Sequence, residues 1–396
     1  MTQKKSDPRS WNMSTQLVRA GTLRSNFGET SEAIFLNSGY CYESAEIAES
    51  RFNGSAPGFA YSRYSNPSLS MLETRLAVLE GADKALVMAS GMAAVYASIM
   101  CQLKAGDHII ANKVLFSSCY YIITNVLPRL GFEVTLVDGP NLDEWRKAFR
   151  PNTRCVFIET PANPTLELVD IAAVAEMSKK NGSCLILDNV FATPLLQRPL
   201  ELGADVVVYS TTKHLEGQGR TLGGAVIGNE PFMSEILLPY HRHTGPHMSP
   251  FTAWVVLKGL ETLDLRMARH CDNAQALAEL LESHPQVTKV LFPGLPSFPQ
   301  YELAQRQMKR GGCLIAFEVK GGKAGAFAFM NKLKIIDISN NLGDAKSLIT
   351  HPASTTHSSV PKAIKDACGV TENLIRFSVG IEDIDDLKGD ILQALA

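Results

Sequence analysis

The sequence predicts an α/β protein with a mostly parallel central sheet, an amino-terminal arm and a smaller carboxy-terminal α+β domain. Short apolar runs between residues 84 and 228 alternate with helical stretches, a pattern typical of the crossover units that build parallel sheets. Residues 1 to about 60 lack sustained periodicity, and a long amphipathic stretch at 251–283 precedes two further apolar runs. The 396 residues are enough for two domains of about 150 residues each.

We place the arm at residues 1–62, the large domain at 63–256 and the small domain at 257–396. The apolar runs predict strands in the large domain at 84–89, 108–111, 133–137, 155–159, 184–188, 205–209 and 224–228, and the intervals predict helices at 91–103, 117–130 and 170–181. The helical stretch at 251–283 would bridge to the small domain. There we expect strands at 313–319 and 373–380 and helices at 323–333 and 383–395.

The charge balance and the cysteines restrict the partners and the compartment. Lys and Arg number 38 against 40 Asp and Glu, so the chain has no broad basic field to hold nucleic acid or an anionic membrane. The sequence shows no secretory signal and no apolar run near the roughly 18 residues of a membrane span. The eight cysteines form no C-x-x-C pair, which favours reduced thiols. We expect a cytoplasmic protein with small-molecule ligands and neither a nucleic-acid nor a membrane partner.

The stretch "VVVYSTTKHLEGQGRTLGG" at 206–224 indicates a chemical site. A buried-strand pattern ends there in hydroxyl residues and Lys213, and open α/β sheets bind ligands beyond the carboxyl ends of their strands. Asp188 ends another apolar run, "CLILDNV". Alone, such a lysine is usually solvated and such an aspartate often forms a turn. Together they match pyridoxal phosphate, which needs a lysine amine and a carboxylate at its pyridine nitrogen.

The same cofactor also needs donors for its phosphate. The segment "ALVMASGMAAVYASIM" predicts a strand followed directly by a helix. A helix amino terminus binds anions through free N–H groups and the helix dipole, although the same pattern also fits an ordinary capped turn. We expect phosphate donors at Ser90, Gly91, Met92, Ser210 and Thr212.

Six segments, taken in order, resemble the Cys/Met-metabolism family of pyridoxal-phosphate enzymes. They are "YSRYSNPS" (61–68), "SGMAA" (90–94), "ETPANPT" (159–165), "DNVFATP" (188–194), "YSTTKH" (209–214) and "IRFSVGIED" (375–383). The resemblance extends from about residue 15 to the carboxyl end. It implies the aspartate aminotransferase-like fold, fold type I, of pyridoxal-phosphate-dependent transferases.

The resemblance implies roles for individual residues. Lys213 would be the catalytic residue and carry the cofactor covalently, Asp188 would pair with the pyridine nitrogen, and Asn163 would bind the phenolic oxygen. Arg376, in "LIRFSVG", would bind the substrate α-carboxylate, because a guanidinium forms two parallel hydrogen bonds to a carboxylate. Asn341 aligns with a residue near that carboxylate, where relatives often have serine.

The resemblance also implies an oligomer. Tyr61 and Arg63 match a pair that reaches the phosphate site of the neighbouring subunit. The active unit would therefore be a homo-oligomer, a dimer whose subunits share active sites, within a tetramer. This arrangement would give the amino-terminal arm a function.

One position departs from the family pattern. Many relatives have Tyr-Gly-Gly-Thr, with the tyrosine stacked on the cofactor ring, where this chain has "FSSC" at 116–119. Phe116 keeps the stacking face but has no phenol for proton transfer. The departure counts against lyase chemistry that depends on that phenol.

Within the family, residues 241–254 and 337–357 resemble most the sulfhydrylases that act on O-succinylhomoserine. That activity replaces the acyl group by sulfide and yields homocysteine. The alternatives are a cystathionine γ-synthase, an O-acetylhomoserine sulfhydrylase, a γ-lyase and, outside catalysis, a silent scaffold. Cation candidates for the succinyl carboxylate are Arg51, Arg220 and Arg242, and the sequence does not choose among them. We expect no metal site, because Thr, Gly and Pro interrupt the histidines at 241, 243 and 247.

Overall fold

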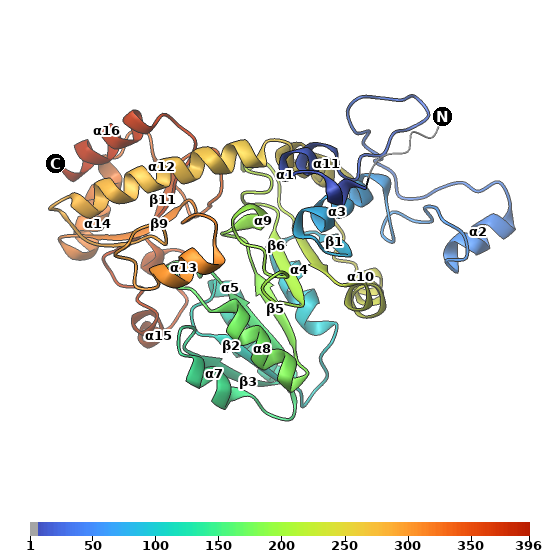
Figure 1. Ribbon diagram of the computed structural model, residues 1–396, viewed down its shortest axis with the longest axis horizontal. Helices are drawn as coiled ribbons and strands as arrows, with labels where there is room; N and C mark the ends of the chain where they lie inside the picture. The colour runs from blue at the N-terminus through green and yellow to red at the C-terminus, as the bar shows by residue number, and fades with distance from the viewer. Residues whose placement is uncertain (1–6) are drawn as a thin grey trace.

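The computed structural model describes residues 7–396, which are organised around two β-sheets (Figure 1). The larger sheet has the strand order β1-β7-β6-β5-β4-β2-β3. Strand β7 runs antiparallel to both β1 and β6, and the other neighbouring strands are parallel. The prediction of a mostly parallel sheet is confirmed. The strands are β1 (Lys84–Met88), β2 (His108–Asn112), β3 (Glu133–Val137), β4 (Thr153–Glu159), β5 (Cys184–Asp188), β6 (Val206–Ser210) and β7 (Gly224–Gly228).

Helices cover both faces of this sheet, because successive strand residues point to opposite faces. On one face, strand residues such as Ile109 and Phe157 pack with α4 (Gly91–Met100) and with the helical segment 117–129. On the other face, Ile110 and Ile158 pack with α7 (Leu142–Ala148) and α8 (Ile171–Asn181). The strand ends are therefore the part of the sheet that is left open to ligands.

Local signals set the boundaries of several helices. Helix α3 (Pro67–Glu80) begins after Asn66, whose side chain accepts a hydrogen bond from the Ser68 amide, and it ends at Gly81 with a φ of 70°. Helix α8 begins after Asp170 in the same manner and ends at Gly182. An oxygen side chain before the first turn and a left-handed glycine after the last are the usual end signals.

The remaining helical segments connect and flank the two sheets. They are α1 (Met13–Arg19), α2 (Ala45–Phe52), α5 (Ser117–Tyr121), α6 (Leu127–Arg129), α9 (Thr193–Leu196), α10 (Leu238–Thr244), α11 (Pro250–Leu260), α12 (Leu263–Ser283), α13 (Tyr301–Gln307), α14 (Gly322–Lys332), α15 (Lys362–Ala367) and α16 (Ile384–Leu395), with the short segments η1 (Pro8–Ser10), η2 (Ile122–Val126), η3 (Phe232–Leu237) and η4 (Pro352–Ser354). None of these helices, within residues 7–396, is long and apolar enough to cross a membrane.

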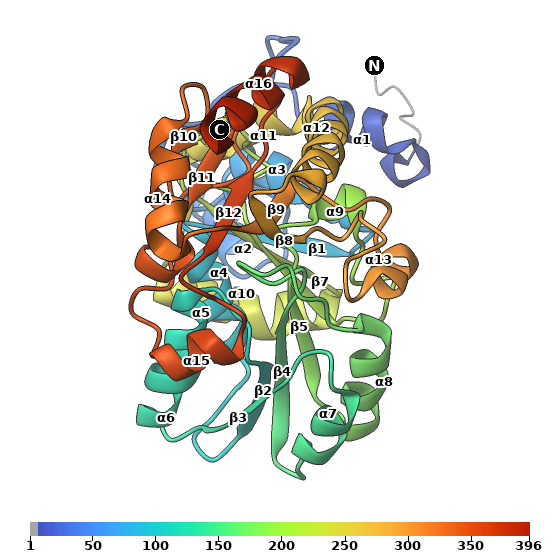
Figure 2. The same ribbon diagram turned by 90° about the vertical axis from the view of Figure 1, so that its left-hand side faces the viewer.

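The smaller sheet has the order β10-β11-β12-β9-β8 (Figure 2). Helix α12 extends from α11 beside the large sheet to the small sheet, where it packs on β8 and β9 (Figure 1). Helices α14 and α16 complete this part of the chain. The strands are β8 (Val287–Leu291), β9 (Leu314–Val319), β10 (Asp337–Ile338), β11 (Leu348–Thr350) and β12 (Leu374–Ser378).

Two features differ from the sequence prediction. The region expected as an extended arm contains the short helices α1 and α2. The expected helix at 251–283 is interrupted near Thr262. There the Arg266 side chain donates to the Gly259 carbonyl, and the Gly259 backbone lies against the backbone of residues 215 and 216. A side chain therefore uses a carbonyl that a continuous helix would need for its own amide.

Candidate active site

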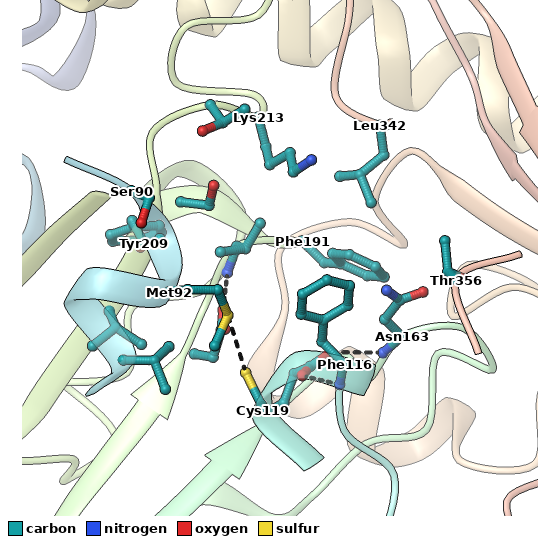
Figure 3. Close-up of a pocket in the computed structure, with 18 of the residues that line it drawn as sticks. Ser90, Met92, Phe116, Cys119, Asn163, Phe191, Tyr209, Lys213, Leu342 and Thr356 are labelled. Atoms are coloured by element: carbon teal, nitrogen blue, oxygen red, sulfur yellow. Dashed lines mark hydrogen bonds between the residues drawn. The ribbon is translucent and has the colours of Figure 1, made fainter. Parts of the chain in front are cut away.

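A cavity of about 380 Å³ lies at the carboxyl ends of β4, β5 and β6 (Figure 3). Residues of the small-sheet region close its other side. Tyr61 and Arg63 do not line it, whereas the other predicted site residues do: Ser90, Gly91, Met92, Phe116, Asn163, Asp188, Ser210, Thr212, Lys213, Asn341 and Arg376.

Lys213 lies just beyond the end of β6, in a loop held by main-chain hydrogen bonds. The Thr211 amide donates to the Gly223 carbonyl at 2.9 Å, and the Gly217 amide donates to the Lys213 carbonyl at 2.7 Å. The Lys213 Nζ points into the cavity (Figure 3) and donates to Asn341 Oδ1 at 2.6 Å. Burial, and then the positive charge of Arg376, lower the pKa of Lys213 to about 8. More of this lysine is therefore an uncharged amine near neutral pH than is usual.

The amino terminus of α4 forms one end of the cavity. Ser90 caps the helix by accepting a hydrogen bond from the Ala93 amide at 3.1 Å, which leaves its O–H able to donate to a ligand. A Cβ on Gly91 would lie 2.7 Å from the Ser210 Cβ. The close approach needs a glycine, and it brings the first amides of the helix next to the end of β6. Such a helix terminus provides N–H donors and a favourable dipole for an anion.

Two predicted hydroxyl donors differ in their surroundings. The Thr212 hydroxyl accepts from the Gly223 amide at 3.0 Å and donates to the Gly223 carbonyl at 3.3 Å. Its oxygen is thus oriented by the strand that follows. Ser210 lines the cavity beside Gly91, and its side chain has no hydrogen bond to any residue of 7–396. Ser210 is therefore the hydroxyl more available to a ligand.

Asp188 lies next to a second buried acid, Glu159. Glu159 accepts hydrogen bonds from the amides of Phe116 at 2.7 Å and Asn163 at 2.8 Å, and Asp188 accepts one from the Val190 amide at 3.1 Å. Burial raises the pKa of both carboxyls, and the charge of Asp188 raises that of Glu159 further. A cationic group bound beside Asp188 would compensate this unfavourable burial of negative charge.

Arg376 is buried, at 2% exposure, and is arranged to accept a carboxylate. Its guanidinium donates to Asn163 Oδ1 at 3.2 Å and to the carbonyls of Asn340 at 2.9 Å and Asn341 at 3.1 Å. Its Nε is buried without a hydrogen-bond partner, and no acidic side chain within residues 7–396 forms an ion pair with it. A buried arginine with neutral acceptors and one unpaired N–H is suited to an anionic ligand.

The bond from Arg376 also orients Asn163. Because Asn163 Oδ1 accepts from the guanidinium, its Nδ2 remains as the donor for a ligand in the cavity. This is the polarity that a phenolate oxygen requires. The Phe116 ring faces the same space (Figure 3), as expected for a stacking face without a phenol.

The structure places Tyr61 and Arg63 away from this cavity. Tyr61 is 40% exposed. The Arg63 guanidinium lies 5.4 Å from the centre of the Tyr61 ring and 5.1 Å from that of Tyr64, and it donates to the Arg242 carbonyl. Neither residue contributes to the cavity of its own chain, so their contribution to a neighbouring subunit stays a prediction.

Sequence reasoning missed several lining residues, among them Glu159, Leu342, Thr356 and Cys119. Glu159 ends the apolar run of β4 just as Asp188 ends that of β5, so its position at a strand end was a usable signal. Leu342 and Thr356 lie in irregular loops of the small-sheet region, where no periodicity indicates direction. Cys119, Glu159 and Asp188 have ligand atoms within 4.8 Å of one another, and all three belong to this cavity.

The fold and the cavity together define a pyridoxal-phosphate-dependent enzyme. The family model described as Cys/Met metabolism PLP-dependent enzyme matches residues 14–396, and the chain belongs to this family. The O-succinylhomoserine sulfhydrylase of Mycobacterium tuberculosis is 50% identical over 383 residues, 96% of this chain and 94% of that protein. The L-methionine gamma-lyase of Porphyromonas gingivalis is 43% identical, and the match covers 99% of each chain.

A solved structure shows the same fold. The metY protein of Campylobacter jejuni superposes with a TM-score of 0.94 at 32% identity, covering 97% of this chain and 100% of that one, and it contains N'-pyridoxyl-lysine-5'-monophosphate. Fold type I is thereby confirmed, and pyridoxal 5'-phosphate is the cofactor. The cavity fits this group, because it is lined by the amino terminus of α4, by the Lys213 amine and by the Asp188 carboxyl, which has no cationic partner within residues 7–396.

Proposed function

We propose that the chain is an O-succinylhomoserine sulfhydrylase, which replaces the succinyl group of O-succinyl-L-homoserine by sulfide to give L-homocysteine and succinate in methionine biosynthesis. The observation that supports it is the position of Arg376, a buried cation without an acidic partner within residues 7–396, on the same cavity as Lys213. Lys213 and Arg376 together suit an α-amino acid substrate, whose amine and carboxylate must be held at the same time. The choice of ester and nucleophile follows the 50% identity to the Mycobacterium tuberculosis enzyme.

We assign the following steps to residues of the chain. Arg376 binds the substrate α-carboxylate, and so directs the Cα–H bond toward Lys213. The Lys213 amine removes the proton from Cα and returns a proton later in the reaction; its lowered pKa, about 8, favours the basic form. Asp188 holds a proton on the pyridine nitrogen. When bound, pyridoxal 5'-phosphate supplies the electron sink that makes loss of these protons possible.

The remaining site residues orient the cofactor. We propose that Asn163 donates to its phenolic oxygen and that Phe116 stacks on its ring. The phosphate would be held by Ser90, Gly91, Met92, Ser210 and Thr212, with Tyr61 and Arg63 of the neighbouring subunit. This assignment requires a homodimer as the smallest active unit, and we propose a tetramer of two such dimers. We also propose that the chain divides into an arm, a large domain and a small domain at residues 62 and 256, and that the enzyme is cytoplasmic.

The second carboxylate of a succinyl ester needs its own cation. Arg220 is paired with the buried Glu216. Neither Arg51 nor Arg242 has an acidic partner within residues 7–396; both guanidiniums lie over tyrosine rings, at 5.4 Å and 5.2 Å. This difference favours Arg51 and Arg242 over Arg220 as the cation that binds the succinyl carboxylate.

A side-by-side assay tests the proposal. Purified enzyme is given the succinyl or the acetyl ester of homoserine with either sulfide or cysteine, or methionine alone, and homocysteine, cystathionine and methanethiol are measured. We expect homocysteine from the succinyl ester and sulfide as the fastest reaction. Faster formation of cystathionine would identify a cystathionine γ-synthase, and faster release of methanethiol from methionine would identify a γ-lyase. No product from any combination would support the silent scaffold.

A further inference from the structure

The contact between Lys213 and Asn341 joins two parts of the cavity. Lys213 follows β6 of the large sheet, and Asn341 lies in the loop between β10 and β11 of the small sheet. Their side chains meet at 2.6 Å, Nζ to Oδ1. The preceding residue, Asn340, also lines the cavity, and its carbonyl accepts a hydrogen bond from Arg376.

The loop that presents Asn341 is fixed from several directions. The Asn341 carbonyl accepts from the Arg376 guanidinium at 3.1 Å, and the Asn341 amide donates to the Ser339 hydroxyl at 3.3 Å. Two residues on, the Gly343 amide donates to the Ser378 hydroxyl at 2.9 Å. The backbone that carries the Asn341 side chain is therefore held in place from β12, the strand that carries Arg376. An acceptor fixed in this way can orient a flexible lysine side chain.

We propose that Asn341 is a positioning residue for the Lys213 amine: its Oδ1 holds Nζ on the cavity side whenever that amine is not bonded to the cofactor. The inference rests on the proposed function only in requiring that Lys213 is the cofactor-bearing lysine. This role differs from the one expected from the sequence, which places Asn341 near the substrate carboxylate. Its Nδ2 has no hydrogen bond within residues 7–396 and can still face that carboxylate.

An acceptor at this distance influences protonation as well as position. A carbonyl oxygen binds an ammonium more strongly than an amine, because the charged donor forms the stronger hydrogen bond. Asn341 thus raises the pKa of Lys213, while burial and Arg376 lower it. The balance of these opposing effects on the pKa leaves a proton on the Lys213 Nζ that can be delivered to a substrate carbon.

Other titratable groups surround the same amine. Those that line the cavity are Cys119, Glu159, Asp188, Tyr209 and Arg376, and His214 follows Lys213 directly. Burial lowers the pKa of His214 to about 3, so it stays neutral. The carboxyl groups have raised pKa values and titrate in the same pH range, but none of their hydrogen bonds involves Asn341, so their titration is common to all variants. A shift in the protonation of Lys213 that a substitution at Asn341 causes therefore reports the contact between Lys213 and Asn341.

The test measures cofactor capture rather than turnover. Full-length protein freed of its cofactor is mixed with pyridoxal 5'-phosphate from pH 6 to 10, and the rate of capture is followed by visible absorbance. Capture requires the uncharged amine, so its midpoint reports the protonation of Lys213. We expect Asn341→Leu to move the midpoint to lower pH and Asn341→Asp to higher pH, each by about one pH unit.

Matched variants of an asparagine outside the cavity are the control. Asn331→Leu and Asn331→Asp change an exposed side chain of α14 that does not line the cavity, and their midpoints should stay close to that of the unchanged protein. Equal shifts at both positions, shifts of the two Asn341 variants in one direction, or no shift would overturn the proposal. Asn341→Asp is isosteric, so comparison with Asn331→Asp decides the matter if the leucine variant does not fold. The measurement involves no ester and no sulfide, so its outcome is independent of the assay of the proposed function.

Discussion

At the scale of single residues, the cavity combines two basic groups, Lys213 and the buried Arg376, with two acids, Asp188 and the buried Glu159. The charge of Arg376 contributes to the lowered pKa of Lys213, and the charge of Asp188 contributes to the raised pKa of Glu159. Asp188 could be predicted from the sequence because it ends a clear apolar run. Lys213 could be predicted because it follows another such run after three hydroxyl residues. Leu342 and Thr356 could not, since their direction depends on how the small-sheet loops fold over the cavity.

The first prediction concerns Lys213. Lys213→Ala should lower homocysteine formation by several orders of magnitude, because it removes both the covalent attachment of the cofactor and the base at Cα. Steady-state rates with the succinyl ester and sulfide measure the effect. Lys180→Ala is the control, since that lysine is exposed and pairs only with Glu176 on α8. Comparable losses in both variants would contradict the assignment.

The second prediction is a pH dependence of stability. Burial raises the pKa of Glu80 from 4.5 to about 7, although Tyr209 donates a hydrogen bond to it. A raised carboxyl pKa means that the folded protein binds the proton more tightly, so this contribution is complete below pH 4.5 and is lost as the pH rises through 7. Glu80→Gln keeps an acceptor for Tyr209 and removes the titration.

The measurement is urea unfolding of both proteins at pH 5 and pH 8, at one protein concentration and with cofactor held constant. The free energy of unfolding of the unchanged protein, relative to the variant, should fall by roughly 2–3 kcal/mol between these pH values. An equal pH dependence in the two proteins would show that Glu80 does not titrate in this range.

At the scale of elements, the sequence predicted the strands of the large sheet and the helices α4, α8, α14 and α16 to within a few residues. It succeeded because buried parallel strands give continuous apolar runs. Among the elements it missed are α1 and α2, which are too short to show a helical period, and also α3, β8, β10 and β11. The break between α11 and α12 depends on the contact of the Arg266 side chain with the Gly259 carbonyl, which no local pattern reveals.

The third prediction concerns the junction of α4 and β6. Gly91→Ala would place a Cβ at 2.7 Å from the Ser210 Cβ, and the helix terminus would have to move away from the strand end. We expect weaker cofactor binding, by tenfold or more, measured as the dissociation constant by visible titration. Gly389→Ala in α16 is the matched control, because its Cβ meets no atom within 4 Å; it should leave cofactor binding unchanged and stabilise the helix by up to about 1 kcal/mol.

At the scale of the whole molecule, the proposed assignment of Tyr61 and Arg63 makes the active site complete only in an oligomer. The cavity lies between the large and small sheets of one chain, whereas Tyr61 and Arg63 lie outside it. The sequence could predict this division of residues only through family resemblance. A single chain gives no physical signal of which surface faces a second copy.

The fourth prediction uses mixed oligomers. Arg63→Ala should weaken cofactor retention, and Lys213→Ala should abolish turnover. If subunits share sites, refolding the two variants together restores activity, because one site of each hybrid pairs an intact Lys213 with an intact Arg63. Rates at limiting cofactor measure the recovery.

A second mixture is the control for this experiment. Refolding Arg376→Ala with Lys213→Ala should restore nothing, since both residues line the cavity of the same chain. Recovery in this mixture, or none in the first, would contradict sharing of Arg63 across subunits.

A single continuous hydrophobic cluster extends through both parts of the chain. It includes Leu76 of α3, Ile227 of β7, Leu277 of α12, Phe317 of β9 and Ile391 of α16. Because these side chains pack on one another, the small-sheet part of the chain shares its hydrophobic interior with α3 and β7 of the large-sheet part. The enzyme should therefore melt in one cooperative step, and a fragment cut near residue 256 should aggregate rather than survive as an independent folding unit.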